Sequence, residues 1–221
     1  MRAVTGGVRV PGPPVGELAA ALIAASPELD PTGQRLAVTV YRSLAEGEPV
    51  DEDLLVERSG IAAAEVARAL DAWPGVFRDE AGRIVGFWGL CIPRTAHRFR
   101  VGGRELHTWC AWDTLFLAPL LDRVAEVGSH CPDTGRDISL TVAPTGIRTV
   151  EPAQAVLSFL RPEREWADDI ITTFCHHVLF LASPDAGARW LADRPDGFLL
   201  SLDEGFELGR RFIHARVGAA L

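Results

Sequence analysis

The residues of this chain that could carry out chemistry gather in the segment 107–141. A thiol, Cys110, and a carboxyl, Asp113, lie three residues apart there within a helical pattern. Residues i and i+3 of a helix share a face, so these two side chains could meet one substrate atom. A thiolate is a nucleophile and a metal ligand, and a positioned carboxyl can act as a general acid or base. A second candidate thiol, Cys175, lies far downstream in T-F-C-H-H-V-L-F-L.

The other cysteines and the histidines have simpler explanations. Cys131 lies in the turn C-P-D-T-G, where a structural role is favoured, and Cys91 is expected to be a core residue. Four histidines invite a zinc site or a Cys-His protease: His97, His130, His176 and His177. Adjacent His176 and His177 would point to opposite faces of a strand, so at most one could join Cys175. No C-x-x-C or H-x-x-x-H spacing supports zinc.

Composition narrows the class of protein. The chain has 221 residues, a formal net charge of −8 and four cysteines. This length allows one domain or two, and we favour two modest domains. The acidic balance, without a basic stripe, lacks the electrostatic footprint of a nucleic-acid-binding protein. The cysteines are expected to be free thiols of a reducing compartment. With no membrane span or secretory signal in the pattern, we expect a cytoplasmic protein.

The first 90 residues are rich in helical patterns. Apolar residues recur at helical spacing over residues 17–26, 34–44 and 61–73, and a further segment opens with an acidic first turn after Pro49. Two β-prone runs around Glu80, Ala81 and Gly82 predict a hairpin. Helices followed by a hairpin predict a winged-helix-like domain over residues 1–90.

A winged-helix unit often binds DNA by placing one helix in the groove. The helix expected over 61–73 contains Glu65 and Asp71 but only one cation, Arg68. One cation is too few to neutralise the phosphates that such a helix faces. A packing or lid role is therefore favoured over DNA binding.

The second half of the chain changes character. Residues 138–142 alternate as a half-buried strand should, and three more continuously apolar runs also predict strands, at 155–160, 178–182 and 198–202. A short helix is expected over 166–173, and a longer helix ends the chain. Strands with interspersed helices and no regular βαβ rhythm predict an α+β fold, with a mixed or antiparallel sheet and packed helices that carry the site.

Six segments of this half, taken together, resemble the alkylmercury lyases, also called organomercurial lyases. They are P-R-T-A-H-R-F at 93–99, W-C-A-W-D-T-L-F at 109–116, S-H-C-P-D-T-G at 129–135, S-L-T-V-A-P at 139–144, F-C-H-H-V-L-F at 174–180 and E-G-F-E-L-G at 204–209. The segments follow the family's order, and each alone is weak. The resemblance implies that residues 91–221 form the catalytic domain. It also implies that Cys110, Asp113 and Cys175 are the catalytic and mercury-binding residues, and that Cys131 is structural.

The chemistry of the residues agrees with that implication. Mercury(II) is a soft ion, and thiolates are the softest ligands that a protein offers. A substrate R–Hg–X must end as R–H, X–H and protein-bound mercury, so two thiols must supply two protons and two ligands. The remaining need is a group that moves a thiol proton to carbon, and Asp113 fits it. A helix beginning near Trp109 could help by lowering the pKa of Cys110.

The hypothesis is therefore protonolysis of a carbon–mercury bond with Hg(II) left as a bis-thiolate. Apolar neighbours would form the wall for the organic group: Trp109, Trp112, Leu115 and Phe116. The resemblance implies no resident cofactor, an external thiol for turnover, and thiol carriers or a mercuric reductase as acceptors of Hg(II). We expect no nucleic acid or membrane partner, and either a monomer or a homodimer.

Two other classes stay open at this point. A binding module could use Cys110 and Cys175 to hold a soft metal without cleaving anything, although storage does not need the proton relay that Asp113 offers. A transcriptional regulator could combine the N-terminal unit with sensor thiols, and the acidic helix argues against it.

Overall fold

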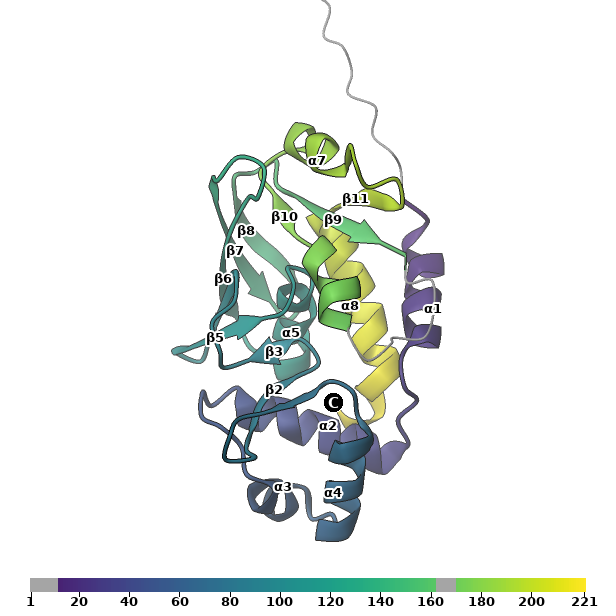
Figure 1. Cartoon of the computed structure of the whole chain (residues 1–221), viewed down its shortest axis with the longest axis vertical. Helices are drawn as coiled ribbons and strands as arrows, with labels where there is room; N and C mark the ends of the chain where they lie inside the picture. Colours follow the sequence, from purple (N-terminus) through teal and green to yellow (C-terminus); the bar gives the residue numbers. More distant parts are fainter. Residues whose placement is uncertain (1–11, 162–169) are drawn as a thin grey trace, which may run out of the picture.

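The computed structural model describes residues 12–161 and 170–221 (Figure 1). Its helices are α1 (Val15–Ala25), α2 (Pro31–Leu44), α3 (Glu52–Ser59), α4 (Ala63–Ala72), α5 (Asp113–Leu121), α6 (Ile170–Thr173), α7 (Pro184–Leu191) and α8 (Leu202–Val217), with 3₁₀ turns η1 (Cys175–His177) and η2 (Gly218–Ala220). Its strands are β1 (Val76–Arg78), β2 (Ile84–Phe87), β3 (Leu90–Cys91), β4 (His97–Val101), β5 (Arg104–Thr108), β6 (Ala125–His130), β7 (Asp137–Ala143), β8 (Gly146–Glu151), β9 (Val156–Leu160), β10 (Phe180–Leu181) and β11 (Gly197–Ser201).

The N-terminal helices form where the sequence signals are strongest. Asp30 caps α2, because its carboxylate accepts a hydrogen bond of 2.6 Å from the Gly33 amide, and Pro31 occupies the first turn. The apolar stripe of this helix is fully buried and consists of Leu36, Val40 and Leu44. The predicted helical unit is thus present, and the hairpin predicted around 80–82 is formed by β1 and β2.

One continuous sheet joins the two halves of the chain. Its strand order is β1-β2-β3-β5-β4-β6-β7-β8, and every neighbouring pair is antiparallel. The hairpin that follows α4 therefore extends the sheet of the second half. A smaller antiparallel sheet, β10-β9-β11, lies beside it (Figure 1). The predicted α+β class, with an N-terminal helical unit followed along the chain by an antiparallel sheet, is confirmed.

Two helices, α5 and α8, form the centre of the packing. Ser201 and Glu204 start α8 with a reciprocal capping box. Gly209 on α8 allows close approach to α5, because a Cβ there would lie 2.8 Å from the Cβ of Phe116. The Trp112 indole also donates a 3.0 Å hydrogen bond to the carbonyl of Gly205 on α8. The glycines of the E-G-F-E-L-G segment thus permit the close contact between α5 and α8.

Two local predictions were wrong. The helix expected to begin near Trp109 begins at Asp113, so Cys110 lies in the preceding turn and the two residues do not share a helix face. Cys175 does not start a strand. It opens the 3₁₀ turn η1, and the strand β10 begins only at Phe180. Of the short helix expected over 166–173, residues 170–173 are helical and the rest lies outside the described residues.

Within the described residues, no helix combines the length and the apolar character that crossing a bilayer requires.

Candidate active site

Hydrogen bonds from its backbone to two side chains hold Cys110 in the turn before α5. The Cys110 amide donates to Oδ2 of Asp113 at 2.8 Å, so this carboxylate satisfies a backbone donor of the turn that precedes the helix. On the other side, the Thr108 hydroxyl donates to the carbonyl of Cys110 at 2.8 Å. The Cys110 thiol and the Asp113 carboxyl are therefore close together, as expected, but because of this turn and not because they share a helix face.

A backbone hydrogen bond connects this turn to the segment of Cys175. The Ala111 amide donates to the carbonyl of Val178 at 3.0 Å, and the Val178 amide closes η1 onto the carbonyl of Cys175 at 3.1 Å. One ligand atom from each of Cys110, Asp113 and Cys175 then lies within 4.8 Å of the others. The fold therefore brings together the three residues that the sequence singled out, and all three are buried.

Burial sets the protonation of this group. It raises the pKa of Asp113 from its ordinary 3.8 to about 6, against hydrogen bonds from the amide and the thiol of Cys110 that lower it. Burial also raises the pKa of Cys110 well above its ordinary value, and the neighbouring Cys175 and Asp113 raise it further. The expectation that a helix N-terminus lowers the pKa of Cys110 is therefore wrong. At neutral pH the site holds a protonated Cys110 thiol beside a carboxyl that can both accept and donate a proton.

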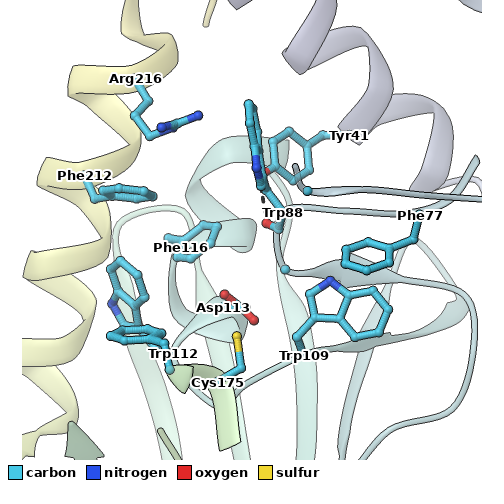
Figure 2. A pocket seen from close by; sticks show the side chains of 13 residues that line it. Tyr41, Phe77, Trp88, Trp109, Trp112, Asp113, Phe116, Cys175, Phe212 and Arg216 are labelled. Carbon is cyan, nitrogen blue, oxygen red and sulfur yellow. Dashed lines mark hydrogen bonds between the residues drawn. The ribbon is translucent and has the colours of Figure 1, made fainter. Parts of the chain in front are cut away.

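An aromatic cavity of about 40 Å³ covers the group (Figure 2). Asp113 and Cys175 line it, whereas Cys110 lies behind them and is fully buried. The other lining residues are Tyr41, Gly75, Phe77, Trp88, Gly89, Trp109, Trp112, Phe116, Phe174, Phe212 and Arg216. Three of the four expected wall residues are among them, and the fourth, Leu115, is a core residue with no exposed surface.

The N-terminal region contributes part of this wall, and the sequence reasoning missed it. Trp88 has a φ of 30°, a conformation that costs energy for any residue with a side chain. Its carbonyl accepts a 2.9 Å hydrogen bond from the Tyr41 hydroxyl, and its amide donates to Gly75 at 3.0 Å. A Cβ at Gly75 would overlap the Trp88 ring. These contacts hold Trp88 over the site, and no local sequence pattern indicates them.

Arg216, at the end of α8, was also missed. Leu208, Phe212 and Arg216 follow one another at intervals of four and therefore share the buried face of the helix. A charge on an otherwise apolar stripe is the signal that could have identified this residue.

The remaining cysteines lie outside the group of three. Cys91 is fully buried, as expected, and burial together with the nearby Asp113 raises its pKa to about 12. Cys131 is buried in the loop after β6. Its burial would raise its pKa, but hydrogen bonds from Thr134, Ala182 and Asp133 outweigh that effect and lower the pKa.

The histidines do not contribute to the site. His176 and His177 are both exposed on the 3₁₀ turn, so the expected opposition across a strand does not occur. His97 is buried elsewhere, with its Nδ1 2.9 Å from the Ser129 hydroxyl. Within the described part of the chain, the one group of residues with metal-ligand geometry contains no histidine.

Two buried thiols, a carboxyl with a near-neutral pKa and an aromatic cavity define a thiol-based enzyme site suited to a soft metal with an organic substituent. Comparison with known proteins specifies the family. The alkylmercury lyase family model matches residues 92–214, and the model of the helix-turn-helix domain of alkylmercury lyase matches residues 15–88. The chain belongs to the alkylmercury lyase family, and its function is that of an alkylmercury lyase.

Curated relatives agree over most of the chain. The alkylmercury lyase of Pseudomonas putida is 41% identical over 179 residues, which cover 81% of this chain and 83% of that protein. The enzyme of Staphylococcus epidermidis is 40% identical, with coverage of 77% and 78%. The crystal structure of the mercury-bound form of MerB2 superposes with a TM-score of 0.70 at 24% identity, over 90% of this chain and 98% of that one. This last likeness supports the fold.

Proposed function

We propose that Cys110, Cys175 and Asp113 are the residues that cleave the carbon–mercury bond, with mercury as the substrate metal. The observation that carries the proposal is the convergence of their ligand atoms within 4.8 Å beneath an aromatic cavity. Two thiols are also the smallest set that balances the reaction, and one carboxyl is enough to relay a proton between them and carbon. Each thiol supplies one ligand to mercury and one proton to a leaving group.

Exposure to the cavity supports an order for the two thiols. Cys175 lines the cavity and Cys110 does not, so a substrate R–Hg–X meets Cys175 first. The Cys175 sulfur replaces X on mercury, and its proton leaves as X–H. The metal then carries R and one thiolate and lies next to Cys110 and Asp113.

Asp113 completes the reaction as a proton relay. The Cys110 thiol is too weakly acidic to ionise alone, and a bound metal lowers the pKa of a thiol strongly. As the Cys110 sulfur binds mercury, its proton passes to the Asp113 carboxylate. The second thiolate also pushes electron density onto carbon, which takes the proton from Asp113 as the carbon–mercury bond breaks. R–H leaves, and Hg(II) stays between the two sulfurs.

Release of Hg(II) requires an external partner. Two buried thiolates bind a soft ion tightly, and an external dithiol offers the same ligand pair with the advantage of a chelate. We propose that small thiols or a mercuric reductase accept the ion. The N-terminal unit, residues 1–90, acts in this proposal as a wall of the cavity, and residues 91–221 form the catalytic domain with Cys131 as a structural thiol.

Headspace gas chromatography tests the roles. Purified protein with phenylmercury and excess thiol should release benzene. Asp113→Asn should release none above background yet still retain mercury, because both thiols remain, and Cys110→Ser should also fail to release benzene. Full turnover by either variant would contradict the assignment.

A further inference from the structure

Arg216 is a buried cation in the wall of the active-site cavity. Its residue exposure is 9%, and it lines the same cavity as Asp113 and Cys175. The guanidinium carbon lies 4.4 Å from the centre of the Trp88 ring and 5.5 Å from that of Phe212. Figure 2 shows it at one end of the pocket, with Phe116 between it and the pair of Asp113 and Cys175.

The hydrogen bonding of this guanidinium is incomplete. Nη1 donates to the carbonyl of Pro27 at 3.1 Å, whereas Nη2 is buried and has no hydrogen-bond partner among the described residues. No carboxylate of the described chain forms an ion pair with Arg216, although Asp113 lines the same cavity. A buried charge without a counter-ion is costly, so an anion that entered the cavity would be bound favourably.

From this geometry we infer that Arg216 binds a carboxylate carried by the organic group of the substrate, and so adapts the enzyme to anionic arylmercurials. The inference rests on the proposed function, because it takes Cys175 as the residue that holds the metal. Arginine presents a planar fork of donors that matches a carboxylate, and it remains charged when buried.

The linear coordination of a mercury atom bound to Cys175 favours the organic group over X as the source of the carboxylate. Two-coordinate mercury(II) is linear, so once Cys175 has replaced X, R points away from that sulfur into the cavity. The aromatic side chains between the sulfur and Arg216 suit an aryl ring. A carboxylate on that ring would extend toward the guanidinium, whereas X has already left.

The contact should be visible as substrate selectivity. The ratio of kcat/KM for 4-(hydroxymercuri)benzoate to that for phenylmercury is measured from the release of benzoate and benzene. Arg216→Met keeps the apolar stem and removes the charge, and we expect this ratio to fall about ten- to a hundredfold, as loss of a charged hydrogen bond would cause. Arg216→Lys keeps the charge without the fork and should give an intermediate ratio.

Controls separate this role from a structural one. Arg210 lies on the same helix, is exposed and pairs with Glu207, so Arg210→Met removes an equal charge outside the cavity and should leave the ratio unchanged. If Arg216 only holds α8 against Pro27 and Trp88, Arg216→Met slows both substrates alike and the ratio does not move, which would overturn the inference. A further control places the carboxylate on X: phenylmercury is supplied with mercaptoacetate, which has a carboxylate, or with 2-mercaptoethanol, which has none. If Arg216→Met changed the rate with mercaptoacetate but not with 4-(hydroxymercuri)benzoate, the inference would also be overturned.

A mercury-free probe makes the two proposals fail separately. Benzoate should quench the fluorescence of the wild-type protein, and Arg216→Met should weaken its binding at least tenfold relative to Arg210→Met. Benzamide, which has no charge, should bind both variants alike. Binding of benzoate without any carbon–mercury cleavage would refute the proposed catalytic roles and keep the anion site. Equal binding of benzoate to wild type and Arg216→Met would refute the anion site and leave those roles intact.

Discussion

The two sides of the cavity come from different parts of the chain and differ in kind. The region matched by the alkylmercury lyase model supplies the three groups proposed to react, Cys110, Asp113 and Cys175. The region matched by the helix-turn-helix model supplies the aromatic faces of Tyr41, Phe77 and Trp88 and contributes nothing to that group of three. A domain type associated with DNA here forms a wall of an active-site cavity.

This difference suggests that one side of the cavity carries out the reaction and the other shapes the space for the substrate. Variants of the reacting side should eliminate cleavage, and variants of the N-terminal side should alter stability and substrate fit by smaller factors. Large losses of cleavage from the N-terminal side, or small losses from the reacting side, would break the comparison.

Removal of a reacting thiol should have the largest effect. We expect Cys175→Ser to lower cleavage of phenylmercury at least about a thousandfold, because an alcohol is a hard, weak ligand for mercury. Benzene release under single-turnover conditions measures this loss. Cys91→Ser is the matched control, since Cys91 is an equally buried thiol outside the group of three, and it should retain most activity.

The junction of the two regions should show the next largest effect. Gly89, between β2 and β3, has a φ of 104°, and a Cβ there would lie 2.7 Å from Cγ of Asp113. Gly89→Ala should therefore displace the carboxylate and lower kcat about a hundredfold. Gly82, in the neighbouring hairpin, also has a positive φ but no atom near its Cβ position. Gly82→Ala should cost about 1 kcal/mol of folding stability and leave kcat within twofold.

The pH dependence should identify the relay. Asp113 must be ionised to accept a proton, and its pKa is about 6, so the single-turnover rate should rise about tenfold per pH unit below 6 and level off above it. A rate profile without a break near pH 6 would contradict this role.

The same carboxyl should destabilise the fold at neutral pH. The Asp113 carboxyl keeps its proton up to about pH 6 in the folded state and only up to about pH 3.8 in the unfolded state. Its contribution to stability is therefore fully present below pH 3.8 and is lost as pH rises through 6, by about 3 kcal/mol. In urea denaturation, Asp113→Asn should become more stable than wild type as pH increases from 4 to 7. A stability difference that does not vary with pH would show that Asp113 is not buried as described.

The smallest effect is expected at the N-terminal wall. Tyr41→Phe removes the hydrogen bond to the carbonyl of Trp88 and should cost about 1 kcal/mol of folding stability. The ring remains, so kcat/KM should fall by less than about fivefold. A loss comparable to that of Cys175→Ser would mean that the Tyr41 hydroxyl takes part in the reaction.

The sequence predicted which residues meet, and less well how they meet. Cys110 and Asp113 were expected on one helix face, yet the carboxylate caps the turn that holds the cysteine. For Cys175 the apolar run 178–182 suggested a strand that began too early, because a 3₁₀ turn and a strand can share the same short apolar pattern. The motifs predicted which residues come together, and local periodicity did not predict the backbone conformation around them.

The parts of the cavity wall that Tyr41, Trp88 and Arg216 supply could not be predicted, because they depend on contacts between distant segments. In the sequence, Tyr41 has the pattern of an ordinary residue of an amphipathic helix. Its hydroxyl becomes part of the site only through its hydrogen bond to the carbonyl of Trp88. Arg216 lies in the last turn of a helix, where a basic residue is usual because it offsets the negative end of the helix dipole. Its place on the apolar stripe of α8 indicates burial, but the contact with the ring of Trp88 cannot be inferred from that stripe.

The separation of the two thiols along the chain has a consequence for the product complex. The Ala111–Val178 hydrogen bond brings together cysteines roughly 65 residues apart, and in the proposed product a single mercury ion joins them covalently. Such a cross-link closes a loop in the unfolded chain and, by the entropy estimate used for disulfides, stabilises the folded state by about 4 kcal/mol. The enzyme should therefore be hardest to unfold just after it has reacted. An acceptor that removes the ion therefore also returns the protein to the less stable, metal-free state that can bind the next substrate.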